Sequence, residues 1–211
     1  MKDQATAYHE AGHAVAAFYV GRAFTSISIE EDEDSFGRVV RKAPGEWFRP
    51  DVEIDGRTRR RIEQDIMIGL AGPLAEERFT GMSNEAGAGL ITPEGMNVGV
   101  LLPGSDLQRV VDLSLYMSGG GDDEAFAFVE WLRQRTLSLL NQYWPSRSLE
   151  ELAAQLLVDR TLSWKRAKQV IQKPIELEMG KRRYVHAKVA SAARLLHAEN
   201  ELQESEDEKG P

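Results

Sequence analysis

The 211-residue chain contains no cysteine. Disulfides, thiolate metal sites and a cysteine nucleophile are therefore excluded. Any metal must be held by histidine and carboxylate side chains, a ligand set that suits zinc and, less specifically, other divalent ions. The absence of cysteine therefore limits any metal site in this chain to histidine and carboxylate ligands.

Long apolar runs and an excess of basic residues are also missing. The longest nearly apolar stretch, 66–75, is interrupted by glycine and proline and is far shorter than the roughly 20 residues of a membrane helix. The N-terminus lacks the apolar segment of a signal peptide. The formal net charge is −8, which argues against nucleic acid as a partner. We expect a soluble, cytoplasmic protein with no membrane segment.

Hydrophobic periodicity predicts a mainly helical fold with a small sheet near the N-terminus. Alternation in 25–30 and 36–40 predicts a hairpin, and Ser105 is a candidate N-cap. The predicted helices are 4–20, 59–79, 105–117, 122–143, 148–158, 163–172 and 181–203.

Turns and domain limits follow from proline, glycine and charge. A turn is predicted at 145–148 and a break at Pro174, and the glycine-rich segment 81–105 is expected to be a mobile loop. We predict one domain over residues 1–175, with a C-terminal helix and a disordered acidic tail over 176–211. The basic run from Arg57 to Arg61 is expected to be a solvated helix start without a function.

The predicted first helix contains the motif HExxH, formed by His9, Glu10 and His13. Side chains at i and i+4 lie on one face of a helix, so both imidazoles can bind one tetrahedral Zn²⁺. Glu10 can take a proton from a water that zinc activates. A chance match on a surface helix is the alternative, but the helix is amphipathic and holds two of the four histidines.

A catalytic zinc needs a third protein ligand. The remaining histidines, on the last predicted helix, are more typical of packed or solvent-facing positions, so carboxylates are the candidates. Glu76 and Glu77 lie on the 59–79 helix, and Asp106 follows the glycine-rich loop at a helix start. The residues alone leave these candidates open.

The motifs resemble those of the FtsH family of membrane-anchored AAA+ zinc proteases. Residues 7–16 are similar to that family's zinc helix, 69–81 to its Leu-Gly-Gly-Arg-Ala-Ala-Glu-Glu segment (with Pro73 where arginine is usual), and 104–109 to its Ser-Asn-Asp-Leu helix start. The resemblance implies that Asp106 is the third zinc ligand and that Glu76 or Glu77 orients a ligand histidine. Family members assemble as hexamers, so the resemblance is compatible with a homo-oligomer, but the sequence does not give the oligomeric state.

The resemblance covers about residues 4–172. The region after Met117 is shortened relative to the family, and residues 173–211 have no counterpart in it. The chain has no GxxxxGK[ST] phosphate loop, so we expect the peptidase domain alone, with activity that does not depend on ATP. Residues Phe36, Gly37, Arg38 and Val39 resemble the family's edge strand, which implies that they bind peptide substrate by backbone pairing. A plain hairpin is the alternative, and the 81–105 loop could either gate the site or be inert.

These observations predict a zinc-dependent, ATP-independent endopeptidase that acts on proteins or peptides. The alternative, from another functional class, is a non-catalytic or regulatory module that keeps the same fold and binds a protein partner. The intact Glu10 favours the enzyme, because a binding module does not need a general base. A protease with a single target, such as a repressor, is not distinguished from the first prediction by sequence.

Overall fold

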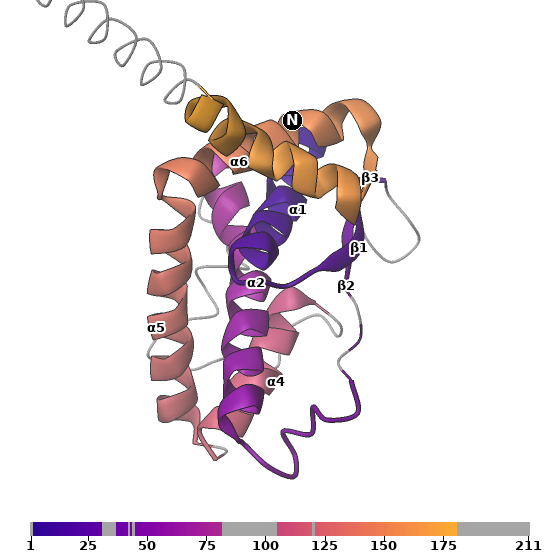
Figure 1. The fold of residues 1–211 in the computed structure, drawn as a ribbon. Helices are drawn as coiled ribbons and strands as arrows, with labels where there is room; N and C mark the ends of the chain where they lie inside the picture. The colour runs from indigo at the N-terminus through magenta and orange to yellow at the C-terminus, as the bar shows by residue number, and fades with distance from the viewer. Residues whose placement is uncertain are drawn as a thin grey trace, which may run out of the picture. The chain divides into compact units, whose positions relative to one another are not determined.

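A computed structural model describes residues 2–30, 37–41, 43, 45–81, 105–119 and 121–180 (Figure 1). Contacts divide the chain into two units, Met1–Gln172 and Lys173–Pro211. Within the second unit the described residues, 173–180, are helical. The predicted helix 181–203, the acidic tail and almost all of the 81–105 loop lie outside the described residues.

The described chain is mainly helical with one small antiparallel sheet, as the sequence predicts. Residues 164–180 form a further helix after the last strand. The other elements, in chain order, are α1 (Lys2–Tyr19), β1 (Phe24–Ser28), β2 (Arg38–Arg41), α2 (Gly56–Thr80), α4 (Asp106–Met117), α5 (Asp122–Leu140), α6 (Tyr143–Asp159) and β3 (Thr161–Ser163).

The sheet has three strands in the order β2-β1-β3. The predicted hairpin is present, since β1 pairs with β2 in antiparallel fashion. The third strand was not predicted, because β3 has only three residues and pairs with a strand more than a hundred positions earlier. Ile27, fully buried in β1, lies between Val39 on one side and Leu162 on the other. Within the described residues β2 is therefore an edge strand.

Helix α1 lies at the centre of the first unit and contacts α2, α5, α6, β1 and β2. Its alanine-rich face is buried, and small residues allow α2 to pack unusually close to it. A Cβ at Gly12 would collide with the Ala71 carbonyl oxygen and lie 2.7 Å from Ala75 Cβ. The HExxH helix is thus held in the core by backbone approach as well as by side-chain packing.

Two proline-based predictions are wrong. The expected turn at 145–148 is part of α6, where Pro145 lies in the first turn and its missing N–H would have no acceptor within the helix. The expected break at Pro174 is also absent, because residues 164–180 are continuously helical. Pro73 likewise lies inside α2. Pro73 and Pro174 lie beyond the first turn of their helices, so the loss of one backbone hydrogen bond is tolerated at each of these two positions.

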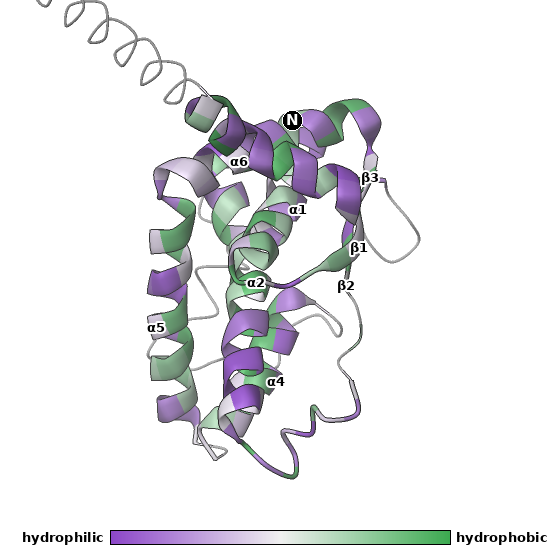
Figure 2. Cartoon of the chain, viewed as in Figure 1, coloured by the Kyte–Doolittle hydropathy of each residue, from purple (hydrophilic) through white to green (hydrophobic). Residues whose placement is uncertain are grey.

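Hydropathy follows the packing of each helix (Figure 2). Hydrophilic residues gather in the first turns of α2, whereas its middle turns are largely apolar and buried. Among the described residues no helix combines the length and apolar character needed to cross a membrane.

Candidate metal centre

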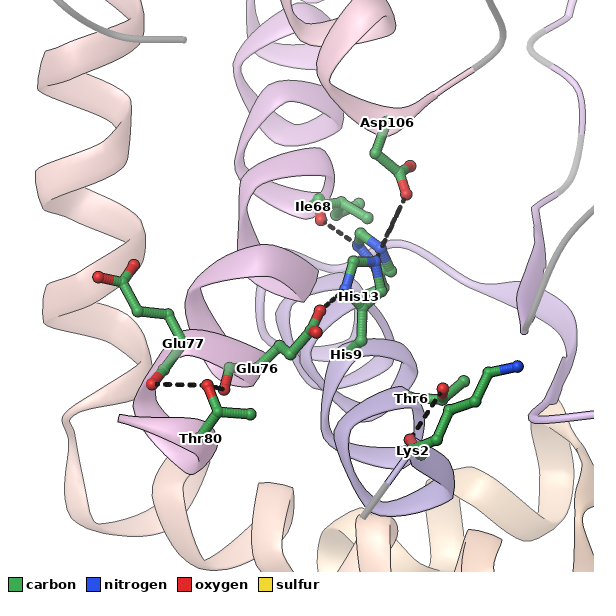
Figure 3. Close-up of polar contacts among 9 residues, drawn as sticks. All are labelled: Lys2, Thr6, His9, His13, Ile68, Glu76, Glu77, Thr80 and Asp106. Atoms are coloured by element: carbon green, nitrogen blue, oxygen red, sulfur yellow. Dashed lines mark hydrogen bonds and ion pairs between the residues drawn. The ribbon is translucent and has the colours of Figure 1, made fainter. Parts of the chain in front are cut away.

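Three potential metal ligands converge from two helices. His9 and His13 lie one turn apart on α1, and Asp106 is the first residue of α4 (Figure 3). Asp106 Oδ2 lies 3.0 Å from His13 Nε2 and 3.9 Å from His9 Nε2. One ligand atom from each residue falls within 4.8 Å of the others. This is the only such group of histidines and acidic residues found among the described residues.

The geometry of this group fits a metal ion. Two ligands bound to a tetrahedral zinc at 2.0–2.1 Å are separated by roughly 3.3 Å, close to the two nitrogen–oxygen distances found here. His13 Nε2 is buried and makes no hydrogen bond, although Asp106 Oδ2 lies 3.0 Å away. A buried polar atom without a partner is costly, and coordination of a cation would satisfy it.

The tautomer of His13 is determined by a backbone contact. Its Nδ1 lies 2.6 Å from the Ile68 carbonyl oxygen, which can only accept a hydrogen bond. Nδ1 therefore carries the proton, and the neutral ring keeps the lone pair of Nε2 for a metal. The carbonyl of Ile68 has no signature in the sequence, so this partner could not be predicted from residue types.

Glu76 orients His9 in the same way that the Ile68 carbonyl orients His13. Its Oε2 accepts a hydrogen bond of 2.8 Å from His9 Nδ1, which leaves Nε2 on the side of Asp106. Glu77 takes no part in this cluster: Figure 3 shows its carboxylate directed away from both histidines. Of the two glutamates considered from the sequence, Glu76 is the one placed to orient a ligand.

Gly72 on α2 leaves room for the His13 ring, because it has no side chain. A Cβ added at Gly72 would overlap the His13 ring, with Nε2 as the nearest atom and Cδ2 2.8 Å away. Any larger residue here would push the ring out of its position. Gly72 belongs to the segment that resembles the FtsH family, but its contact with His13 is visible only in three dimensions.

Asp106 is positioned by ordered backbone at the start of α4. Ser105 is the N-cap, and its side chain accepts a hydrogen bond from the Gln108 amide, as predicted from the sequence. Because Asp106 is the first residue of the helix, its short side chain has little freedom relative to the helix axis. The carboxylate can therefore be presented to α1 in a defined direction.

The cluster has a negative electrostatic environment. Burial alone would lower the pKa of His9, but the carboxylates of Asp106, Glu76 and Glu10 outweigh burial and raise it to about 10. Without a metal, this environment retains a proton on the imidazole. A metal cation benefits from the same field and competes with that proton.

Glu10 lies beside the predicted substrate strand. It is only 6% exposed, and a Cβ at Gly37 would come within 2.9 Å of both its Cγ and its Oε1. Glycine just before β2 therefore lets the strand approach the carboxylate of the motif. Arg38 is on the exposed side of β2, whereas Val39 packs against the core. Phe36 lies outside the described residues.

The chain matches no known protein-family model, and no curated protein shows significant similarity to it. The resemblance to the FtsH family consequently stays a prediction that rests on the motifs themselves. The structure contributes an independent observation, a group of two histidines and one aspartate that could hold a metal ion.

Proposed function

We propose that this chain is a zinc-dependent endopeptidase whose activity does not require ATP. The observation that carries the proposal is the His13 ring, whose Nδ1 is committed to a backbone carbonyl while its buried Nε2 faces His9 and Asp106 without a hydrogen bond. Two neutral imidazoles and one carboxylate form a ligand set typical of catalytic zinc with one open position. The FtsH-like motifs support the same assignment.

When bound, zinc would supply Lewis acidity that polarises the scissile carbonyl and makes water a stronger nucleophile at neutral pH. His9, His13 and Asp106 would hold it. The ligands together carry one negative charge, so the site keeps a net positive charge toward the reacting oxygen atoms. Glu76 and the Ile68 carbonyl keep both rings in the required tautomer and orientation.

Glu10 would act as the general base. It is next to His9 in sequence, is not one of the three grouped ligands, and lies beside Gly37, just before β2. Its carboxylate would accept the proton of the attacking water and return it to the leaving amine. Because β2 is the edge of the described sheet, an extended peptide could add to it by backbone hydrogen bonds and pass close to Glu10.

Metal analysis and a protein digest test the proposal together. The purified chain should contain one zinc and should cleave casein with or without ATP, and a chelator should abolish cleavage. The Glu10→Gln variant should keep zinc but lose nearly all activity, because only the general base is removed. Stoichiometric zinc with no cleavage of casein or a peptide library would favour the binding module instead. Absence of zinc binding would disprove the proposal that His9, His13 and Asp106 form a zinc site.

A further inference from the structure

Helix α2 contributes no metal ligand, yet it contacts all three ligand residues. The contacts fall on one stripe of the helix with spacings of three or four residues. Ile68 and Gly72 lie against His13, and Glu76 holds His9. Gly69 completes the stripe on the side of α4, where an added Cβ would lie 3.4 Å from the Asp106 carbonyl oxygen and 2.8 Å from Val110 Cγ2.

One turn earlier on the same stripe lies a buried carboxylate, Asp65, which is 1% exposed. Its Oδ2 accepts a hydrogen bond of 2.8 Å from Arg61 Nε, and Arg61 is itself only 5% exposed. The expectation that the whole run from Arg57 to Arg61 is solvated is therefore wrong for Arg61. Burial of this arginine is possible because the carboxylate four residues later compensates its charge.

Asp65 also faces a second guanidinium, from another helix. Arg109 Nη2 lies 3.5 Å from the same Oδ2 atom. Arg109 is on α4, one turn after Asp106, so its contact joins α2 to the first turn of the helix that carries the carboxylate ligand. Since Arg61 already compensates the Asp65 charge, the contact with Arg109 is not needed to neutralise a buried ion.

We propose that Asp65 and Arg109 are positioning residues for the metal ligand Asp106. The ion pair and the close approach at Gly69 hold the first turn of α4 against α2 from two neighbouring points. Together they set the distance and direction of the Asp106 carboxylate relative to the two imidazoles on α1. This inference rests on the metal site of the proposed function. It implies that two residues outside the HExxH motif contribute to the metal affinity.

Arg109→Gln is the most informative variant, because Arg109 is 45% exposed and its removal leaves the buried Arg61–Asp65 pair intact. Zinc affinity, measured by competition with a chromophoric chelator, should weaken roughly tenfold, the lower end of the effect of outer contacts on a metal site. The unfolding temperature of the metal-free protein should change little. Arg109→Lys, which restores the positive charge, should recover part of the affinity.

Two controls separate positioning from general stability. Arg59→Gln removes an exposed ion pair with Glu63 on the same helix and should leave zinc affinity unchanged. In an Asp106→Asn background, Arg109→Gln should have no further effect on zinc affinity, because the residue it positions is already lost. Unchanged affinity in the single variant, or an equal loss in the Asp106→Asn background, would overturn the inference. If the unmodified chain did not bind zinc, the proposed metal site itself would be disproved, and not only the role of Arg109.

Discussion

Glu76 and His9 lie 67 positions apart in sequence, on two different helices, and are joined by a 2.8 Å hydrogen bond. The bond connects α2 to the first histidine of the HExxH motif and leaves the other ring nitrogen on the side of Asp106. A carboxylate next to the ligand imidazole makes that imidazole a better donor to a metal. The pair therefore links the packing of α2 to the chemistry of α1.

Replacing Glu76 by glutamine tests this link. We expect Glu76→Gln to bind zinc about 10–100-fold more weakly or to lose activity by a similar factor, since the His9 ring loses its charged partner. Glu77→Gln is the matched control, because it changes the neighbouring residue on the same helix without touching either histidine. Equal losses in both variants would contradict the assigned role of Glu76.

Gly72→Ala should disrupt the site by volume alone. The new methyl group would overlap the His13 ring, so the ring must move away from His9 and Asp106. We expect loss of stoichiometric zinc in metal analysis and a clear fall in unfolding temperature. Gly56→Ala, at the exposed start of the same helix, has nothing within 4 Å of the new methyl and should preserve both properties. A Gly72→Ala protein with full zinc content would refute the steric argument.

Asp106→Asn removes the anionic ligand while keeping the shape of the side chain. We expect much weaker zinc binding, because the cation then faces two neutral imidazoles and a poorer third ligand. Asp112→Asn is a suitable control on the exposed side of the same helix. An X-ray structure with zinc bound and the Asp106 oxygens well beyond about 2.2 Å from it would exclude Asp106 as a ligand.

The ion pair between Asp3 and Arg160 predicts a pH effect at the start of α1. The hydrogen bond from Arg160 holds the pKa of Asp3 below its ordinary value of 3.8. A lowered folded-state pKa means that the pair stabilises the fold above the unfolded-state pKa and loses this effect as the pH falls through the folded-state pKa. Arg160→Gln should raise the Asp3 pKa toward its ordinary value. Carboxyl titration by NMR measures it, and an unchanged midpoint would disprove the pairing.

Local patterns in the sequence were enough to locate most of the helices and the candidate ligands. HExxH spacing places His9 and His13 on one face of a helix, and the Ser105 cap marks where α4 begins. These features depend on neighbours within one or two turns. That is why they could be recognised without knowledge of the tertiary structure.

Other features required contacts between distant segments. Strand β3 exists only because β1 offers a free edge, and the burial of Arg61 depends on packing that periodicity does not reveal. The Ile68 carbonyl orients His13 through the backbone, which any residue type could supply. The choice between Glu76 and Glu77 likewise depended on the rotation of α2 about its axis, which a sequence defines only approximately.

The wide separation of the ligands along the chain has a consequence for folding. About ninety residues lie between His13 and Asp106, so a metal bound to both would act as a cross-link that closes a long loop. Such a loop can close only after α4 has docked, which places completion of the centre late in folding. Withdrawal of the metal would release the start of α4 from α1 while the buried contacts between α1 and α2 persist. Amide hydrogen exchange should then accelerate first in residues 106–110, ahead of the rest of the domain.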